Sequence, residues 1–125
     1  MPQTRLVYYR ESDGSVPLED WLAALPRKAQ QKCAAYLARL EFEGHDLRRP
    51  IADYLRDGIY ELRPSRAGVR YRILYFFHGK QGVVVSHGLI QEQTVPPKEI
   101  ERAVRRMQAF LADPRRHTFD PEKRS

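Results

Sequence analysis

Two arginines in a β-like segment are the first chemically suggestive feature of the chain. Residues 69–77 read VRYRILYFF, and alternate side chains of an extended strand point to opposite faces, so Arg70 and Arg72 share one side. Guanidinium groups match phosphate oxygens and stay charged, so this face could bind a polyanion such as RNA. The alternative is a solvated sheet face on which the arginine stems cover apolar neighbours.

A further arginine and a histidine flank this segment. Arg63 ends the stretch IYELR, and His87 lies within VVVSHGLI. An imidazole with its ordinary pKa of about 6.5 can act as a general acid or base, although a lone histidine is more often a structural hydrogen-bonding residue. Arg63 could equally pair with Glu61 or with a carboxylate on a helix.

The face that His87 occupies depends on the hairpin between the two strands. With four unpaired residues after Phe77, Arg72 lies opposite His87. With five, His87 lies opposite Ile73 on the core face, because a slip of one residue exchanges the two faces of a strand. The sequence leaves both registers open.

The elements that must position these residues follow from the apolar spacing and from the glycines and prolines. Strands are predicted over 4–10, 59–63, 69–77 and 83–90, and helices from Pro17 to Pro26, from Pro26 to Gly44, and from Pro96 or Pro97 to Asp113. Residues 45–58 are predicted to be a loop. The order β–α–α–β–β–β–α predicts an α+β fold with a helical hairpin and a C-terminal helix packed on a small, mainly antiparallel sheet.

The central strand should carry a different layer on each face. Its odd positions, from Val69 to Phe77, are β-branched or aromatic and should lie under the helical hairpin. Its even positions begin with the two arginines and become apolar, as expected if the C-terminal helix covers only one end. We expect one domain over residues 1–113 and a flexible C-terminal tail over 114–125.

Composition narrows the class of protein. The 125 residues carry a net charge of +6, with 42% hydrophobic and 30% charged residues, which is typical of a single globular domain. The basic balance favours an anionic partner, and the alternative is that the charge serves only solubility. No apolar run approaches the roughly 20 residues that span a bilayer, and no secretory signal is recognisable. The lone Cys33 excludes an internal disulfide, so a cytoplasmic location and no membrane partner are expected.

The sequence gives little support for a metal site, a phosphate-binding loop or a serine nucleophile. The four histidines are scattered and no cysteine pair exists, so neither a metal nor a cofactor is predicted. There is no phosphate-loop glycine pattern and no serine nucleophile elbow. The basic residues of the last predicted helix include Lys98 and Arg102, which could contact phosphates or could simply be its solvated side.

Four segments in order resemble the phage-derived Gp49-like, HigB-type branch of the RelE/ParE toxin superfamily. They are LRDGIYELR (55–63), YRILYFF (71–77), HGLI (87–90) and TVPPKEIERA (94–103), and the likeness covers roughly residues 5–111. The resemblance implies a RelE-like fold and the toxin half of a type II toxin–antitoxin pair, whose partner is commonly a helix-turn-helix antitoxin.

The resemblance also implies an activity and a site. RelE- and HigB-like toxins cleave mRNA on the ribosome without a metal, by attack of the 2′-hydroxyl on the adjacent phosphate. By position in the motifs, Arg63, Arg72 and His87 are the catalytic candidates, and Arg70, Lys98 and Arg102 are the candidates for RNA binding.

One stretch departs from the family pattern. Where related sequences usually carry a lysine pair, this chain has Gln91, Glu92 and Gln93. The loss leaves open a binding module of RelE fold that does not cleave RNA and serves as an antitoxin partner or regulator. A ParE-like toxin that acts on gyrase is a further alternative.

Overall fold

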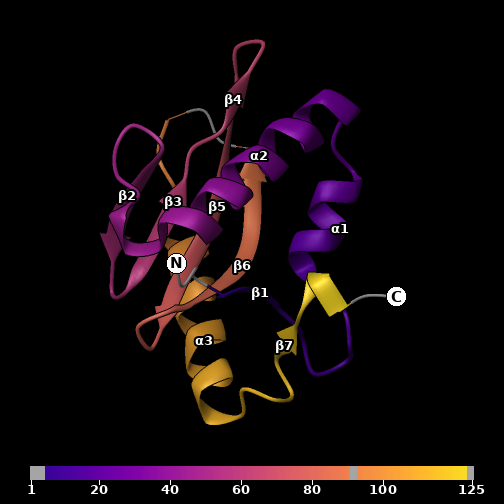
Figure 1. Ribbon diagram of the computed structural model, residues 1–125, viewed down its shortest axis with the longest axis vertical. Coiled ribbons are helices and arrows are strands. Elements are labelled where there is room, and N and C mark those ends of the chain that lie inside the picture. Colours follow the sequence, from indigo (N-terminus) through magenta and orange to yellow (C-terminus); the bar gives the residue numbers. More distant parts are fainter. Residues whose placement is uncertain (1–4, 91–92, 124–125) are drawn as a thin grey trace.

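The computed structural model describes residues 5–90 and 93–123, which form a mixed sheet with helices on both faces (Figure 1). The helical elements are α1 (Pro17–Ala23), α2 (Arg27–Glu43), η1 (Gly44–Asp46), α3 (Pro97–Ala112) and η2 (Pro121–Lys123). The strands are β1 (Arg5–Tyr9), β2 (Ala52–Arg56), β3 (Ile59–Leu62), β4 (Ser65–Arg66), β5 (Val69–His78), β6 (Gly82–Ile90) and β7 (Thr118–Phe119). The predicted α+β class is confirmed.

The main sheet has the strand order β2-β3-β5-β6-β1-β7, with the short β4 paired to β5. Its pairs are antiparallel except for β1 and β6, which run parallel with Arg5 opposite Gly82. The first strand of the chain therefore lies inside the sheet, between β6 and β7. The predicted sheet was mainly antiparallel, and this arrangement agrees.

The helices begin and end close to the predicted residues because proline and glycine mark their ends. Pro17 is the first residue of α1, Pro26 is the N-cap of α2, and Gly44 is its C-cap. Gly44 has a φ of 54°, a conformation that favours glycine over residues with a side chain. Pro97 begins α3, and Asp113 follows its last turn.

The predicted loop over 45–58 is wrong in its second half, where Ala52–Arg56 forms β2 and pairs with β3. The turn between the two strands is Asp57-Gly58, with φ values of 55° and 84°. Two positive φ values are those of the tight hairpin turn that Asp-Gly favours. The Asp-Gly pair was thus a local signal for a hairpin that the charge of this segment obscured.

Two apolar clusters fill the two sides of the sheet, as the alternation along β5 predicted. The odd residues Tyr71, Ile73 and Tyr75 belong to the cluster under α1 and α2. The even residues Leu74 and Phe76 belong to the cluster under α3. Trp21 of α1 packs against the first cluster and lies very close to the backbone of β6 at Gly88. A Cβ atom added to Gly88 would lie 2.3 Å from the Trp21 ring.

The C-terminal segment, expected to be a flexible tail, has regular structure over its described part. Thr118 and Phe119 form β7 and pair with Tyr9 and Tyr8 of β1. The ring of His117 stacks on that of Tyr9, with the two planes 4° apart. The segment thereby supplies one edge of the sheet (Figure 1).

Candidate functional site: an arginine-lined hollow beside a buried polar network

The register of the sheet brings the predicted site residues to the face that α3 covers. Glu61 of β3 lies opposite Leu74 of β5, and Leu74 lies opposite His87 of β6, so these three side chains form a row across three strands. Arg72 comes two residues before Leu74 on the same face. Arg72 and His87 therefore share a face, although they do not lie opposite each other.

The position of His87 follows from an irregularity that neither predicted register contained. Phe77 pairs with Val83, which should place His87 opposite Ile73. The register shifts between Leu74 and Tyr75, however, because one extra residue of β6 is accommodated at Ser86. His87 therefore lies opposite Leu74 and points to the α3 side rather than the core side.

Arg72 reaches the expected face but is not free to bind a ligand through its charge. Its side chain is only 6% exposed, and its Nη1 donates to Oε1 of Glu61 at 2.7 Å. Its Nη2 donates to the carbonyl of Gln93, while its buried Nε has no hydrogen-bond partner among the described residues. A buried guanidinium requires a counter-charge, and the neighbouring strand supplies one.

Arg63 and Arg70 are the accessible arginines of this group. With Arg72 they line a hollow of about 210 Å³, whose other lining residues are Pro50, Pro64, Ser65 and Tyr71. The Arg63 side chain is 35% exposed, and its Nε lies 3.9 Å from Oε2 of Glu61. Glu61 thus neutralises mainly Arg72, and the hollow is lined by three guanidinium groups, which suit an anion.

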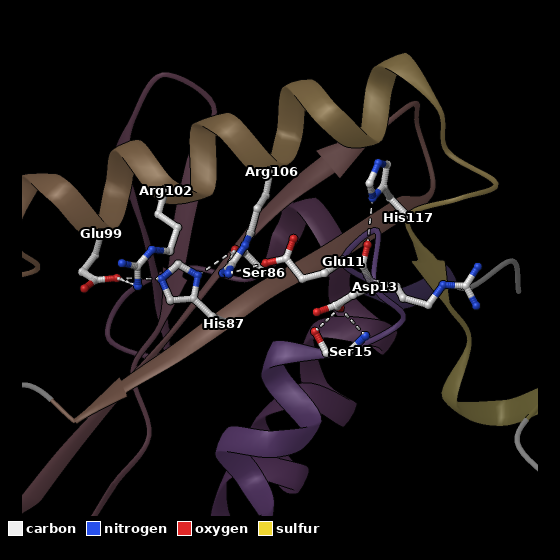
Figure 2. A network of polar contacts seen from close by, with 10 residues as sticks. Glu11, Asp13, Ser15, Ser86, His87, Glu99, Arg102, Arg106 and His117 are labelled. Carbon is white, nitrogen blue, oxygen red and sulfur yellow. Dashed lines mark hydrogen bonds and ion pairs between the residues drawn. The ribbon is translucent and has the colours of Figure 1, made fainter.

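His87 is the centre of a buried polar network under α3 (Figure 2). Its Nδ1 lies 2.7 Å from the hydroxyl of Ser86, and its Nε2 lies 3.1 Å from Oε1 of Glu99. Arg106 donates to the Ser86 hydroxyl at 3.4 Å and to Glu11 at 2.8 Å. The network therefore attaches α3 to β6 through Glu99 and Arg106. Arg106 also attaches α3 to Glu11, which follows β1.

Burial determines the charge of His87. It lowers the pKa of the imidazole to about 4, and the nearby Arg106 acts in the same direction, whereas Glu99 partly opposes both. The ring is consequently neutral at pH 7. Both ring nitrogens of His87 are engaged and its side chain is 7% exposed, so the ring is enclosed between β6 and α3 in this conformation.

The two predicted RNA-binding residues of α3 are exposed. Arg102 donates to Oε1 of Glu99 at 3.1 Å, and the same oxygen contacts His87. Lys98 lies in the first turn of the helix. Neither lines the arginine hollow. Of the stretch that departs from the family pattern, Gln91 and Glu92 lie outside the described residues.

Sequence reasoning missed the carboxylates that organise this face. It named Glu61 only as an alternative partner of Arg63 and did not single out Glu99 or Glu11. The alternation IYELR did place Glu61 and Arg63 on one face, but only the register with β5 brings Glu61 to Arg72. Ser86 carried no signal at all, since its role depends on the irregular pairing of β6.

Within residues 5–90 and 93–123, no group of three or more His, Cys, Asp or Glu side chains is arranged to hold a metal ion. The same residues contain no helix that is both long and apolar enough to cross a membrane.

The fold and this face define a small, basic α+β domain with an arginine-lined hollow on its sheet. Residues 20–108 match the model of the family described as phage derived protein Gp49-like (DUF891). The chain belongs to this family, which is one of RelE/HigB-like toxins, and is accordingly a toxin-like, phage-derived protein. No curated protein matches the chain.

Proposed function

We propose that this protein is the toxin of a type II toxin–antitoxin pair and a metal-independent, ribosome-associated mRNA endoribonuclease that inhibits translation. The observation that carries the proposal is the hollow lined by Arg63, Arg70 and Arg72, in a chain that belongs to a RelE/HigB-like toxin family. The protein would act in the cytoplasm, and its partners would be the ribosome with its mRNA and a cognate helix-turn-helix antitoxin.

The proposed reaction needs no group beyond the RNA, the protein and solvent water. The 2′-oxygen forms a bond to the adjacent phosphorus and the bond from phosphorus to the 5′-oxygen breaks, which leaves a 2′,3′-cyclic phosphate and a 5′-hydroxyl. Solvent water takes up the proton that leaves the 2′-hydroxyl, and solvent water supplies the proton that reaches the 5′-oxygen. The transition state gathers extra negative charge on the phosphate, and a preorganised donor aimed at such charge contributes roughly 3–4 kcal/mol.

The geometry suggests a division of roles among the candidates. Arg63 and Arg70 have accessible guanidinium groups in the hollow, so we assign them to the phosphate. Arg72 is a positioning residue, because its charge is engaged by Glu61. His87 is likewise assigned to holding α3 on the sheet, since burial and its contacts with Ser86 and Glu99 leave it neutral and enclosed.

Lys98 and Arg102 remain proposed contacts for the RNA backbone outside the hollow. Such contacts would add affinity that falls with salt but would add no choice of sequence. Substituting either residue should therefore weaken binding to all messages equally.

The test is primer extension on mRNA recovered from translating ribosomes, with the wild-type protein and with a variant carrying both Arg63→Ala and Arg70→Ala. The matched control carries Arg27→Ala and Lys32→Ala, which removes the same charge from exposed positions on α2. We expect cleavage by wild type and control and at least a hundredfold loss in the double variant, which corresponds to the loss of at least one transition-state contact. Absence of cleavage by wild type, or equal cleavage by all three proteins, would refute the assignment.

A second candidate is a toxin or binding module of the same family that does not cleave RNA, including one that acts on gyrase. The observation in its favour is that Arg72 and His87 are both buried against carboxylates. Induction in cells separates the possibilities: toxicity with intact mRNA and altered DNA supercoiling would favour gyrase. Absence of toxicity, together with co-purification of the product of an adjacent reading frame, would favour a regulatory partner.

A further inference from the structure

A separate cavity lies at the opposite end of β5, on the face that α3 covers. It has a volume of about 570 Å³, within the range of small-ligand sites. Val7 of β1 and Val84 of β6, which are paired in the sheet, line it together with Phe110 near the end of α3. Pro114 and Arg115, from the segment that joins α3 to β7, line it as well.

A glycine in the last row of the sheet lines this cavity. Gly82 lies opposite His78 of β5 on one side and opposite Arg5 of β1 on the other, and all three line the cavity. A Cβ atom at Gly82 would lie 2.5 Å from the carbonyl oxygen of His78, so a side chain is excluded there. In this row Arg5 and His78 therefore carry nitrogen-bearing side chains, and Gly82 between them carries no side chain.

The charge around the cavity is predominantly positive. Asp120 is engaged by Arg5, with 2.8 Å between Nη2 and Oδ2. Arg115 and Lys123 also line the cavity, and both are exposed. Among the described lining residues, one carboxylate thus faces three fixed positive charges, and it is already paired with one of them.

The C-terminal wall of the cavity is firmly attached, so the cavity is preformed. The backbone N–H of Arg10 donates to the carbonyl of His117 at 3.0 Å, and the His117 ring Nδ1 lies 2.8 Å from the Arg10 carbonyl. The Arg10 guanidinium donates to the carbonyls of Arg115 and Arg116. A preformed wall lowers the ordering cost that a ligand must overcome.

Most of the lining lies outside residues 20–108, which match the family model. Arg5 and Val7 precede that range, and Phe110 and the whole C-terminal wall follow it. The cavity is therefore built largely by the flanks of this chain, and it shares no lining residue with the arginine hollow.

We propose that this cavity binds an aromatic anion, a flat apolar ring system that carries one phosphate or carboxylate group. The ring would lie against the apolar part of the lining, of which Pro114 is the exposed member, and the anionic group would face Arg115 and Lys123. The cavity can accept a mononucleotide or an aromatic carboxylate, since both present this chemistry. Binding here is independent of the proposed RNA cleavage, because different residues carry it.

The experiment uses 1-anilinonaphthalene-8-sulfonate, an aromatic sulfonate whose fluorescence rises on binding, with the folded full-length chain. Adenosine 5′-monophosphate and indole-3-acetate are the competitors, and the aromatic cation benzylamine is the control competitor. We expect displacement by one or both anions and none by benzylamine. Displacement by the nucleotide alone identifies a phosphate site, and displacement by indole-3-acetate alone identifies a carboxylate site.

Charge reversal then locates the site. A variant with Arg115→Glu and Lys123→Glu should bind the probe about tenfold or more weakly, a loss of roughly 1.4 kcal/mol or more. Lys32→Glu with Arg48→Glu makes the same change of charge at exposed positions outside the cavity lining and should leave binding unchanged. Amide shifts in ¹H–¹⁵N spectra of the wild type should centre on Gly82 and Thr118.

Equal affinity of both variants, displacement by benzylamine, or absence of displacement by either anion would overturn the proposal. The reversal at Arg115 and Lys123 should leave mRNA cleavage unchanged. Probe binding tests the aromatic-anion site, and mRNA cleavage tests the proposed ribonuclease activity, so failure of one is distinguishable from failure of the other.

Discussion

Arg72 and Glu61 form an ion pair between neighbouring strands, with 2.7 Å between Nη1 and Oε1 and with both side chains more than nine-tenths buried. Glu61 lies opposite Leu74, so the pair runs diagonally across β3 and β5. The same carboxylate lies 3.9 Å from Arg63. Glu61 therefore fixes the floor of the arginine hollow while leaving the more exposed Arg63 available.

Removing one partner of this pair should lower the stability strongly, and neutralising the other partner as well should restore much of it. Arg72→Met should lower the free energy of unfolding by about 3–5 kcal/mol, because it leaves a buried carboxylate without its counter-charge. Adding Glu61→Gln should recover much of this loss, since the unpaired charge is then gone. Urea unfolding of the single and double variants at pH 7 measures both effects. A loss below about 1 kcal/mol in the single variant would contradict the assigned burial of the pair.

His87 predicts a stability that depends on pH in a defined direction. Its pKa is about 4 in the folded protein and about 6.5 in an unfolded chain, so the unfolded state takes up a proton first as the pH falls. The contribution is complete above pH 6.5, is lost between about pH 6.5 and 4, and changes no further below that range. Between pH 7 and pH 5 the loss should be about 2 kcal/mol.

A difference between variants isolates this effect from that of the carboxylates. His87→Asn cannot titrate and should lack the 2 kcal/mol component, whereas His45→Asn, at an exposed position, should retain it. Urea unfolding at both pH values provides the measurement. Identical pH dependence in the wild type and His87→Asn would show that the imidazole titrates alike in the folded and unfolded states.

The contact between α1 and β6 predicts a steric effect. Gly88→Ala places a methyl group 2.3 Å from the Trp21 ring and should cost about 2–3 kcal/mol of stability. Combination with Trp21→Leu should cost less than the sum of the two changes, because the smaller side chain vacates that space. Gly14→Ala is the control: it has no neighbour within 4 Å and only a positive φ of 91°, so it should cost about 1 kcal/mol.

The pairing of β7 with β1 predicts that the C-terminal segment stabilises the domain. A chain that ends at residue 113 loses the stack of His117 on Tyr9 and leaves one edge of β1 unpaired. We expect a loss of about 1–2 kcal/mol, and His117→Ala should account for much of it. Thermal unfolding of the three proteins tests this. An unchanged melting temperature after truncation would support the dispensable tail that the sequence suggested.

Local signals were enough to predict most elements and the two faces of β5. Helix ends were marked by Pro17, Pro26 and Gly44, whose backbone preferences act within a few residues. The alternation of apolar side chains assigned Ile73 and Leu74 to opposite layers correctly. Each of these inferences depends on neighbours along the chain.

What the sequence could not provide depends on partners distant in the chain. The register shift at Ser86 arises in the pairing of β5 with β6. It places His87 on the face of Arg72, as the register with four unpaired residues predicted, but opposite Leu74 rather than opposite Arg72. The counter-charge of Arg72 comes from β3, and only the packed sheet shows that both groups are buried. The sequence of a strand does not show whether the charge of an arginine in it is free or neutralised.

The internal place of β1 in the sheet has a consequence for synthesis on the ribosome. Residues 5–9 are made long before either of their partners, since they pair with Gly82–Val85 on one side and with Thr118–Phe119 on the other. Contacts so distant in the chain form late, since their loops must close first. A nascent chain would therefore expose this apolar strand until Thr118 and Phe119 have left the exit tunnel, and the pairing of β1 with both neighbours would form only after that point.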